Sequence, residues 1–301
     1  MKLRTLVFSG CGTRLIGHAG FIKSVSEHYD LEEVENFAGT SAGSFIASGL
    51  VLGYTPFEIK ELLSKINYLN ISNIDPDLLF NYFNGLGVDD GDKLEKLIKL
   101  IIEKKTGNSN ITFGELYEKT NKFLMISVTN LTSKKIEYIS KDTYPDMPLY
   151  LAIKMSSSIP YYFTPVLWNN EMYVDGAILD NFPIDTFDLS ETLGMYMKKS
   201  DSEKEEIDNV LSFSLAILST LLRNRETDLL DKYKDNTVVY DSDISMVEFK
   251  LSVEDRNMLF DEVYTLTNSF IERLKEKESE INNNEHSNEE GTSSEKESDT
   301  E

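Results

Sequence analysis

The apolar positions near the start of the chain form first a short unbroken run and then a helical repeat. Residues 5–9 are almost continuously apolar, which predicts a short buried strand. Glycine and small polar residues follow at 10–14. Apolar residues then recur with helical spacing at Leu15, Ile16, Ala19, Ile22 and Val25. The sequence therefore predicts a strand, a glycine loop and a helix, in that order.

A second unit of about twenty residues, 34–53, repeats this order. Residues 34–38 predict a second strand, 39–43 form a glycine-containing turn, and 44–52 predict a buried helix. Strands that alternate with helices are typical of a mainly parallel sheet covered on both faces, with ligand sites at the carboxyl ends of its strands. We therefore expect a three-layer α/β/α fold with chemistry at the two glycine turns.

The same patterns divide the rest of the chain up to residue 274. Further helices are predicted at 56–69, 92–105, 113–119, 148–157, 207–222 and 253–274, the one at 207–222 being buried. Further strands are predicted at 122–130, 135–139, 166–168, 172–174, 193–197 and 237–240. Residues 198–209 carry a run of charge and predict a mobile surface insertion.

Composition is that of a globular protein for most of the 301 residues, of which 40% are hydrophobic. The single cysteine, Cys11, excludes an intrachain disulfide, and the N-terminal apolar run is too short for a signal peptide. The longest nearly apolar stretch, 210–222, is too short to span a bilayer. These features favour an intracellular, cytoplasmic protein without a transmembrane helix.

The net charge of −22 argues against a nucleic-acid partner and against simple electrostatic attraction to anionic lipid. Residues 276–301 contribute ten acidic residues against two lysines and have almost no apolar residues. This composition predicts a disordered acidic tail, either an interaction segment or an inert solubilising extension.

The turn Gly39-Thr40-Ser41-Ala42-Gly43 has the form of a nucleophile elbow, in which a sharp strand-to-helix turn exposes a serine hydroxyl. Gly39 and Gly43 fit because side chains there would collide with the strand or the helix. Ser41 is thus a candidate nucleophile. A glycine-rich turn without chemistry gives the same pattern.

A histidine base for Ser41 is difficult to find in this chain. Hydrolases on parallel sheets place their histidine last, yet His18 and His28 precede Ser41, and His286 lies in the acidic tail. A carboxylate is the simplest substitute, and Asp175 is the best candidate because it ends an apolar strand and precedes Gly176 and Ala177. Such a base needs a raised pKa or a direct hydrogen bond to the hydroxyl. For Asp175, an ordinary Asp-Gly turn remains the alternative. For His18, which lies in the first turns of a helix beside the glycine loop, the alternatives are reaching the site and a helix-surface or supporting role.

The loop Gly10-Cys11-Gly12-Thr13-Arg14 supplies candidates for an oxyanion hole, since a glycine turn before a helix exposes backbone N–H groups. Arg14 adds a positive charge or holds the loop in shape. A dinucleotide-binding loop is the competing interpretation, but the third glycine of that fingerprint is missing. Cys11 is either a reactive thiol or a small loop residue.

Taken together, the three motifs resemble the patatin-like phospholipase family. Gly10–Arg14 is similar to its oxyanion loop, Gly39–Gly43 to its elbow, and Asp175-Gly176-Ala177 to its aspartate motif. Residues 155–166 and 179–183 resemble the segments that flank this aspartate. The resemblance covers roughly residues 4–190. It leaves 191–275 as a C-terminal extension packed on the same domain and 276–301 as the tail.

The resemblance implies a Ser41–Asp175 dyad that hydrolyses acyl esters of phospholipids, lysophospholipids or neutral lipids, without a cofactor or a metal. It also implies an acyl lipid as the partner, with peripheral membrane contact, while the oligomeric state stays open. The sequence departs from the family pattern where Cys11 and Leu15 replace loop glycines. A weakened relative that binds lipid or protein is therefore one alternative, and a soluble short-chain esterase is another. Aromatic residues at 80–83 and 161–163 are candidates for interfacial insertion or for core packing.

Overall fold

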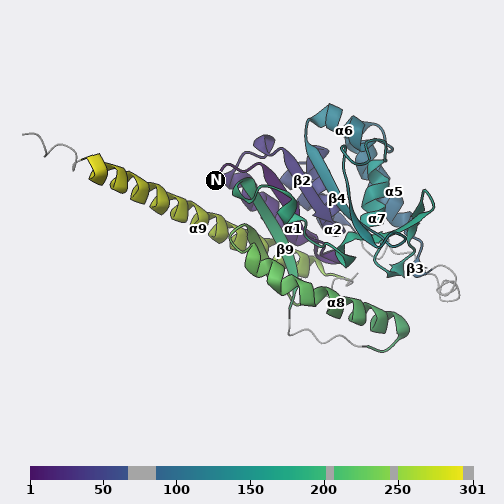
Figure 1. The fold of residues 1–301 in the computed structure, drawn as a ribbon. Helices are drawn as coiled ribbons and strands as arrows, with labels where there is room; N and C mark the ends of the chain where they lie inside the picture. Colours follow the sequence, from purple (N-terminus) through teal and green to yellow (C-terminus); the bar gives the residue numbers. More distant parts are fainter. Residues whose placement is uncertain (67–85, 201–206, 245–249, 294–301) are drawn as a thin grey trace, which may run out of the picture.

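The computed structural model describes residues 1–66, 86–200, 207–244 and 250–293, which surround one large central sheet (Figure 1). The strands are β1 Thr5–Phe8, β2 Asn36–Thr40, β3 Gly87–Asp89, β4 Phe123–Asn130, β5 Lys135–Ile139, β6 Tyr161–Phe163, β7 Val166–Trp168, β8 Glu171–Asp175, β9 Thr192–Lys199 and β10 Thr237–Ser242. The α-helices are α1 Ile16–His28, α2 Ala42–Val51, α3 Pro56–Lys65, α5 Asp92–Thr106, α6 Phe113–Thr120, α7 Leu149–Ser156, α8 Val210–Lys232 and α9 Val253–Ser293.

The large sheet has the order β10-β9-β1-β2-β4-β8-β7, and β5 also pairs with β4. Every pairing from β10 to β4 is parallel, whereas β5, β7 and β8 pair antiparallel with their neighbours. The expected three-layer α/β architecture with a mainly parallel sheet is therefore confirmed. A separate small sheet joins β3 and β6.

Strand β4 has two different partners along one of its edges. Its first part pairs with β2, which ends where Thr40 lies level with Ser127. The same edge then pairs with β8, which runs the opposite way and ends where Asp175 lies level with Val128. The other edge is occupied by β5, which pairs with residues on both sides of this junction. Strands β2 and β8 therefore meet end to end at their carboxyl termini.

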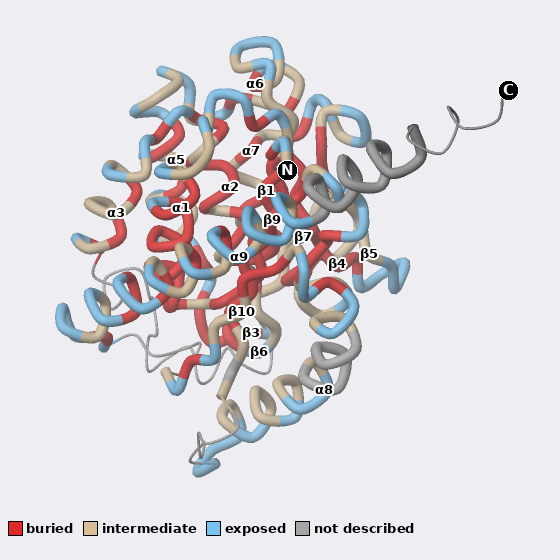
Figure 2. Tube along the Cα trace, turned by 90° about the vertical axis from the view of Figure 1, so that its left-hand side faces the viewer, coloured by how far each residue is buried: buried red, intermediate tan, exposed pale blue. Residues whose placement is uncertain are grey.

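Alternate residues of the central strands enter different apolar clusters on the two faces of the sheet. Leu6 and Phe8 of β1 belong to the larger cluster, whereas Val7 between them belongs to a smaller one with Phe182 and Tyr196. The larger cluster includes residues of α1, α2, α7 and α9. The smaller one is covered by the segment after β8 and by the C-terminal end of α8. Figure 2 shows the resulting buried interior around β1 and β9.

Helix α8 differs from the buried helix expected at 207–222. It begins at Val210 and lies along one side of the molecule (Figures 1 and 2). Large apolar side chains on its outer side are exposed, namely Val210, Phe213, Ile217 and Leu221. The prediction of burial was wrong because apolar residues around a whole helix give no information on which neighbours are available to cover them.

Helix α9 also extends further than expected. It continues to Ser293, so that residues 276–293, expected to be disordered, are helical in the structure. The Glu-rich composition that argued against a packed core does not argue against a helix, since Glu is a good helix former. The end of α9 projects away from the sheet (Figure 1). Residues 80–83, 201–206 and 294–301 lie outside the described residues.

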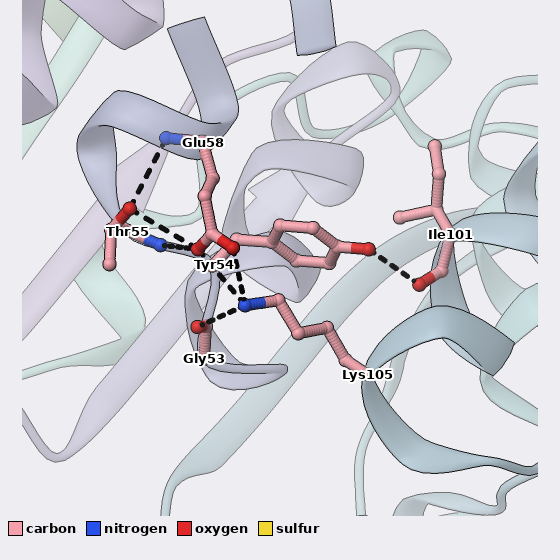
Figure 3. A network of polar contacts seen from close by, with 6 residues as sticks. All are labelled: Gly53, Tyr54, Thr55, Glu58, Ile101 and Lys105. Atoms are coloured by element: carbon pink, nitrogen blue, oxygen red, sulfur yellow. Dashed lines mark hydrogen bonds and ion pairs between the residues drawn. The ribbon is translucent and has the colours of Figure 1, made fainter. Parts of the chain in front are cut away.

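A polar network fastens the start of α3 to the end of α5 (Figure 3). Thr55 and Glu58 form a capping box, each side chain accepting a hydrogen bond from the other residue's backbone N–H. Lys105 donates to both carboxylate oxygens of Glu58 at 2.9 Å and to the carbonyl of Gly53 at 3.0 Å. Tyr54 donates to the carbonyl of Ile101 at 2.8 Å. These bonds fix the chain that leaves α2.

Helices α1 and α9 approach each other so closely that their backbones touch at Gly20. A β-carbon at Gly20 would lie 2.3 Å from the carbonyl oxygen of Phe260 on α9. Gly49 in α2 is different, because its nearest neighbour would be a side-chain atom of Ile59 at 3.9 Å.

We expect Gly20→Ala to lower the free energy of unfolding by about 1–3 kcal/mol, because α9 must move away from α1. Gly49→Ala, the matched control, should raise it by about 0.5–1 kcal/mol, because alanine is the better helix former and has room there. Urea denaturation of the two variants measures both effects. Equal effects of the two substitutions would contradict this account of α9 packing.

Candidate active site

Ser41 occupies the sharp turn between β2 and α2. Its backbone has φ 54° and ψ −125°, a conformation that non-glycine residues rarely adopt and that is associated with functional sites. A β-carbon at Gly39 would lie 2.3 Å from the carbonyl oxygen of Gly43, and one at Gly43 would lie 2.3 Å from that of Phe8. Neither position accommodates a side chain, so both glycines are needed for this turn.

Asp175 contacts Ser41 directly. The Ser41 hydroxyl donates a hydrogen bond of 2.6 Å to Oδ2 of Asp175. The other carboxylate oxygen accepts a 2.9 Å hydrogen bond from the backbone N–H of Ala177. Gly176 between them fits tightly, since a β-carbon there would lie 2.2 Å from the carbonyl oxygen of Ser127. The junction of β2 and β8 on β4 thus brings together two residues 134 positions apart in the chain.

Burial changes the acidity of this carboxyl group. Ser41 is 5% exposed and Asp175 3% exposed, so little water reaches either side chain. Burial raises the pKa of Asp175 to about 7, although the hydrogen bonds from Ser41 and Ala177 act in the opposite direction. A carboxyl group with this pKa can accept and return a proton near neutral pH.

The loop after β1 lies against the elbow. A β-carbon at Gly10 would lie 3.1 Å from the β-carbon of Ser41, and the Gly10 N–H donates to the side chain of Asn181 at 3.0 Å. Gly12 has φ +58°, which favours glycine. Among the described residues, the N–H groups of Cys11 and Gly12 have no hydrogen-bond acceptor. They are therefore able to donate to a ligand.

Arg14 holds this loop to β9. Its buried guanidinium group donates to the carbonyl of Cys11 at 3.1 Å and to those of Lys198 at 3.1 Å and Met197 at 3.4 Å. Of the two roles considered from sequence, the contacts correspond to shaping the loop. Thr13 is also buried and belongs to the same short 3-10 helix, Gly12–Arg14.

Cys11 has φ −150° and ψ 3°, which lies outside the main helix and strand regions but does not need the positive φ that favours glycine. Its side chain is buried in the larger apolar cluster, away from solvent. Burial raises the pKa of its thiol to about 12, so the thiol is neutral and a poor nucleophile at neutral pH. The geometry favours a small packing residue over a reactive cysteine.

His18 lies behind the loop and is fully buried. Its Nε2 is 2.9 Å from the carbonyl oxygen of Ser9. Burial lowers its pKa to about 4, so the ring is neutral at physiological pH. His18 makes a supporting contact to the strand end before the loop. His28 instead contacts Asn268 on α9, at 3.0 Å.

Two residues that hold the site together had no assigned role at the sequence level. The Ser156 hydroxyl accepts a 2.8 Å hydrogen bond from the N–H of Ser41 and donates a 2.7 Å bond to the carbonyl of Ser127. It therefore links α7, the elbow and β4. Asn181 accepts the N–H of Gly10 and donates to the Tyr196 hydroxyl at 3.2 Å. Both residues stood in segments resembling the family, and that position was their only signal.

Within the described ranges, no group of three or more His, Cys, Asp or Glu side chains is arranged to hold a metal ion. None of the helices that the structure describes combines the length and the apolar character needed to cross a bilayer. Of the aromatic candidates for insertion, Tyr161 is exposed, while Tyr162 and Phe163 are buried.

The chain is an α/β protein with a buried hydroxyl–carboxylate pair at a strand-to-helix elbow. Comparison with known proteins identifies its family. Residues 6–188 match the family model described as patatin-like phospholipase, and the chain belongs to this family. The family match stops before β9, although β9 lies beside β1 and accepts the hydrogen bonds of Arg14.

Two viral proteins are similar in sequence. An uncharacterised protein of Acanthamoeba polyphaga mimivirus is 29% identical over 276 residues, covering 86% of this chain and 91% of the relative. A probable lipid hydrolase of Invertebrate iridescent virus 6 is 34% identical over 184 residues, covering 60% of this chain and 62% of the relative.

Solved structures share the fold at low sequence identity. VipD from Legionella pneumophila matches with a TM-score of 0.61 and 19% identity, over 91% of this chain and 67% of VipD. ExoU of Pseudomonas aeruginosa, solved with SpcU, matches with a TM-score of 0.56 and 18% identity, over 90% of this chain. This chain spans about half of ExoU, at 52%.

The raised pKa of Asp175 makes stability depend on pH. The unfolded carboxyl group loses its proton near pH 4, whereas the folded one keeps it up to about pH 7. The native state therefore binds the extra proton between these values, and the contribution of Asp175 to the free energy of unfolding falls as pH rises through this window. Asp175→Asn has no such dependence. We expect the stability of this variant relative to wild type to improve by on the order of 3 kcal/mol between pH 4 and pH 8.

Urea denaturation of both proteins at the two pH values measures this difference. Asp188→Asn is a suitable control, because Asp188 is exposed at its carboxylate and should show no such gain. A difference between Asp175→Asn and wild type that is independent of pH would contradict the assignment of a raised pKa to Asp175.

Proposed function

We propose that this chain is a lipid acyl hydrolase in which Ser41 is the nucleophile and Asp175 the general base. The observation that carries the proposal is the 2.6 Å hydrogen bond from the Ser41 hydroxyl to the buried Asp175 carboxylate. Membership in the patatin-like phospholipase family supports a lipid ester as substrate, as does the similarity to a protein named a probable lipid hydrolase.

Acylation begins when Ser41 Oγ attacks the ester carbonyl and its proton passes to Asp175. The carbonyl oxygen becomes an oxyanion, and the N–H groups of Cys11 and Gly12 stabilise it by hydrogen bonding. The tetrahedral intermediate then collapses. The alcohol leaves with the proton from Asp175, and the acyl group stays on Ser41.

Deacylation follows the same path with water as the nucleophile. Asp175 accepts a proton from the attacking water, the same N–H groups stabilise the second oxyanion, and the fatty acid leaves as Ser41 regains its proton. The carboxylate must therefore be ionised at the start of each half-reaction, which its pKa near 7 allows. The substrate class that we propose is a phospholipid or lysophospholipid, cleaved at an acyl ester by phospholipase A or lysophospholipase action.

The catalytic unit that we propose comprises residues 4–190. Residues 191–275 complete it from outside this range, because β9 holds Arg14 and α9 packs against α1. A soluble esterase acting on short acyl esters would use the same residues. A weakened relative would have the same dyad geometry but no turnover. Assays on short-chain and long-chain esters separate these alternatives, because the lipid hydrolase cleaves long-chain esters, the esterase cleaves only short-chain esters, and the weakened relative cleaves neither.

We expect Ser41→Ala and Asp175→Asn each to reduce kcat/KM for a fluorogenic acyl ester by roughly 10³-fold or more, because each removes one partner of the proton transfer. Ser24→Ala is the matched control, since this buried hydroxyl donates to Asn268 on α9 and contacts neither dyad residue. A fluorophosphonate probe should add its mass to wild type and not to Ser41→Ala. Wild-type turnover no faster than that of Ser41→Ala would refute the proposal.

The pH dependence of kcat/KM provides an independent check on Asp175. The active form of the free enzyme carries the ionised carboxylate, so log(kcat/KM) for a soluble ester should rise with a slope of one below about pH 7 and level off above it. A midpoint near pH 4, the ordinary pKa of aspartate, would show that the base is a solvated carboxylate or a group other than the buried Asp175.

A further inference from the structure

We propose that the outer face of α8 is a docking surface for an uncharged or zwitterionic lipid layer, located beside the segment that follows Asp175. The observation behind the proposal is an apolar face that no described residue covers. Val210, Phe213, Ile217 and Leu221 are 66%, 55%, 47% and 61% exposed. At intervals of three and four residues, these side chains lie along one side of the helix.

The opposite side of α8 already has neighbours, so the exposed face is not simply an unpacked helix. Leu211 packs against the cluster of Val88, Tyr162 and Phe163. Towards the other end, Leu229 and Leu230 pack against the cluster that contains Phe182. The helix is thus attached near both ends, which holds the outer face in a fixed orientation relative to the sheet.

The inner side of α8 borders the segment that follows Asp175. Leu222 and Leu229 line a surface pocket together with Ala177, Leu179 and the segment up to Phe182. Ala177 is the residue whose N–H binds the Asp175 carboxylate. A molecule that rests on the outer face of α8 therefore also lies beside the chain segment that carries Asp175.

Further exposed apolar side chains continue the surface. Leu179 borders the same pocket and is partly exposed. Tyr161 of β6 is exposed and precedes Tyr162, a member of the cluster that Leu211 packs against. Leu86 is exposed directly before β3, which pairs with β6. Figures 1 and 2 place β3 and α8 at the same end of the molecule. The apolar surface thus extends from α8 around one side of the site.

Charge selects among the occupants of this surface. Residues 210–222 contain no charged side chain, and the protein carries a net charge of −22. An anionic membrane would be repelled by the overall charge, and a basic partner would find no acidic group on this face. Exposed apolar side chains that lie together mark surfaces that contact membranes or other proteins, and the uncharged character of this face matches a lipid layer. The inference rests on the proposed function in one respect: an enzyme that hydrolyses lipids must bind the lipid layer that contains its substrate.

Binding is tested separately from catalysis by using Ser41→Ala protein and phosphatidylcholine vesicles. We expect the double variant Phe213→Ser/Ile217→Ser, made in this background, to reduce the vesicle partition coefficient by roughly tenfold or more, because two apolar contacts with the bilayer are lost. Leu100→Ser is the matched control, since Leu100 on α5 has a comparable exposure of 64% but does not belong to the outer face of α8. This control should bind vesicles as the parent does.

In the catalytically intact protein, the same double variant should hydrolyse a water-soluble short-chain ester at the wild-type rate while losing activity on vesicles. Absence of short-chain turnover in the wild type would count against the proposed function and leave the vesicle result to decide the docking surface. Equal partitioning of parent and double variant would overturn the docking surface. So would binding that needs anionic vesicles and is abolished by salt.

Tryptophan fluorescence tests the docking surface without the serine substitutions, which could also affect folding. The chain has one tryptophan, Trp168. In a Trp168→Phe background, Phe213→Trp should show a blue-shifted emission on addition of phosphatidylcholine vesicles, because the indole enters the interface. An unchanged spectrum would contradict docking. A concentration-dependent shift without vesicles, accompanied by a dimer in sedimentation, would assign the face to a second copy of the chain and overturn the proposal.

Discussion

The edge of β4 that is shared by β2 and β8 is the constraint on which the candidate site depends. β2 ends beside Ser127 and β8 ends beside Val128, running towards each other. Because the two strands occupy consecutive parts of one edge, the residues that follow or end them must meet. Ser41 and Asp175 are these residues, and their hydrogen bond is a consequence of strand register. The Ser156 hydroxyl, bonded to both the elbow and Ser127, fixes the same junction from the helical layer.

Burial at this junction lowers the stability of the folded protein while it raises the proton affinity of Asp175. An ionised carboxylate is unfavourable in the interior, and the raised pKa of Asp175 expresses that cost. The same environment gives the carboxyl group a proton affinity suited to exchange with a serine hydroxyl. The neighbouring loop is supported from outside the region that the family model covers, since Arg14 donates to the carbonyls of Met197 and Lys198 on β9. The C-terminal segment is therefore part of the site's architecture.

The two faces of the sheet are covered unequally, and this asymmetry gives α8 its significance. The face with α1 and α2 has a further helix, α9, in direct backbone contact with α1 at Gly20. The other face is covered by a short segment after β8 and by one end of α8. An apolar helix that is attached near its ends and exposed along one side lies next to the chain that carries Asp175. A lipid surface would complete the burial that the fold leaves unfinished.

Local pattern by itself determined the two strand–glycine–helix units, the fold class, and the steric need for glycine at Gly39 and Gly43, because these depend on periodicity and on contacts between near neighbours in the chain. It also singled out Ser41 and Asp175 as chemically unusual. Only the tertiary structure decided that the two side chains touch, that Cys11 turns its thiol into the core, and that Ser156 and Asn181 support the turn. The exposure of α8 and the length of α9 were likewise outside its reach. Register, burial and packing join residues far apart in the sequence, and no local pattern contains that information.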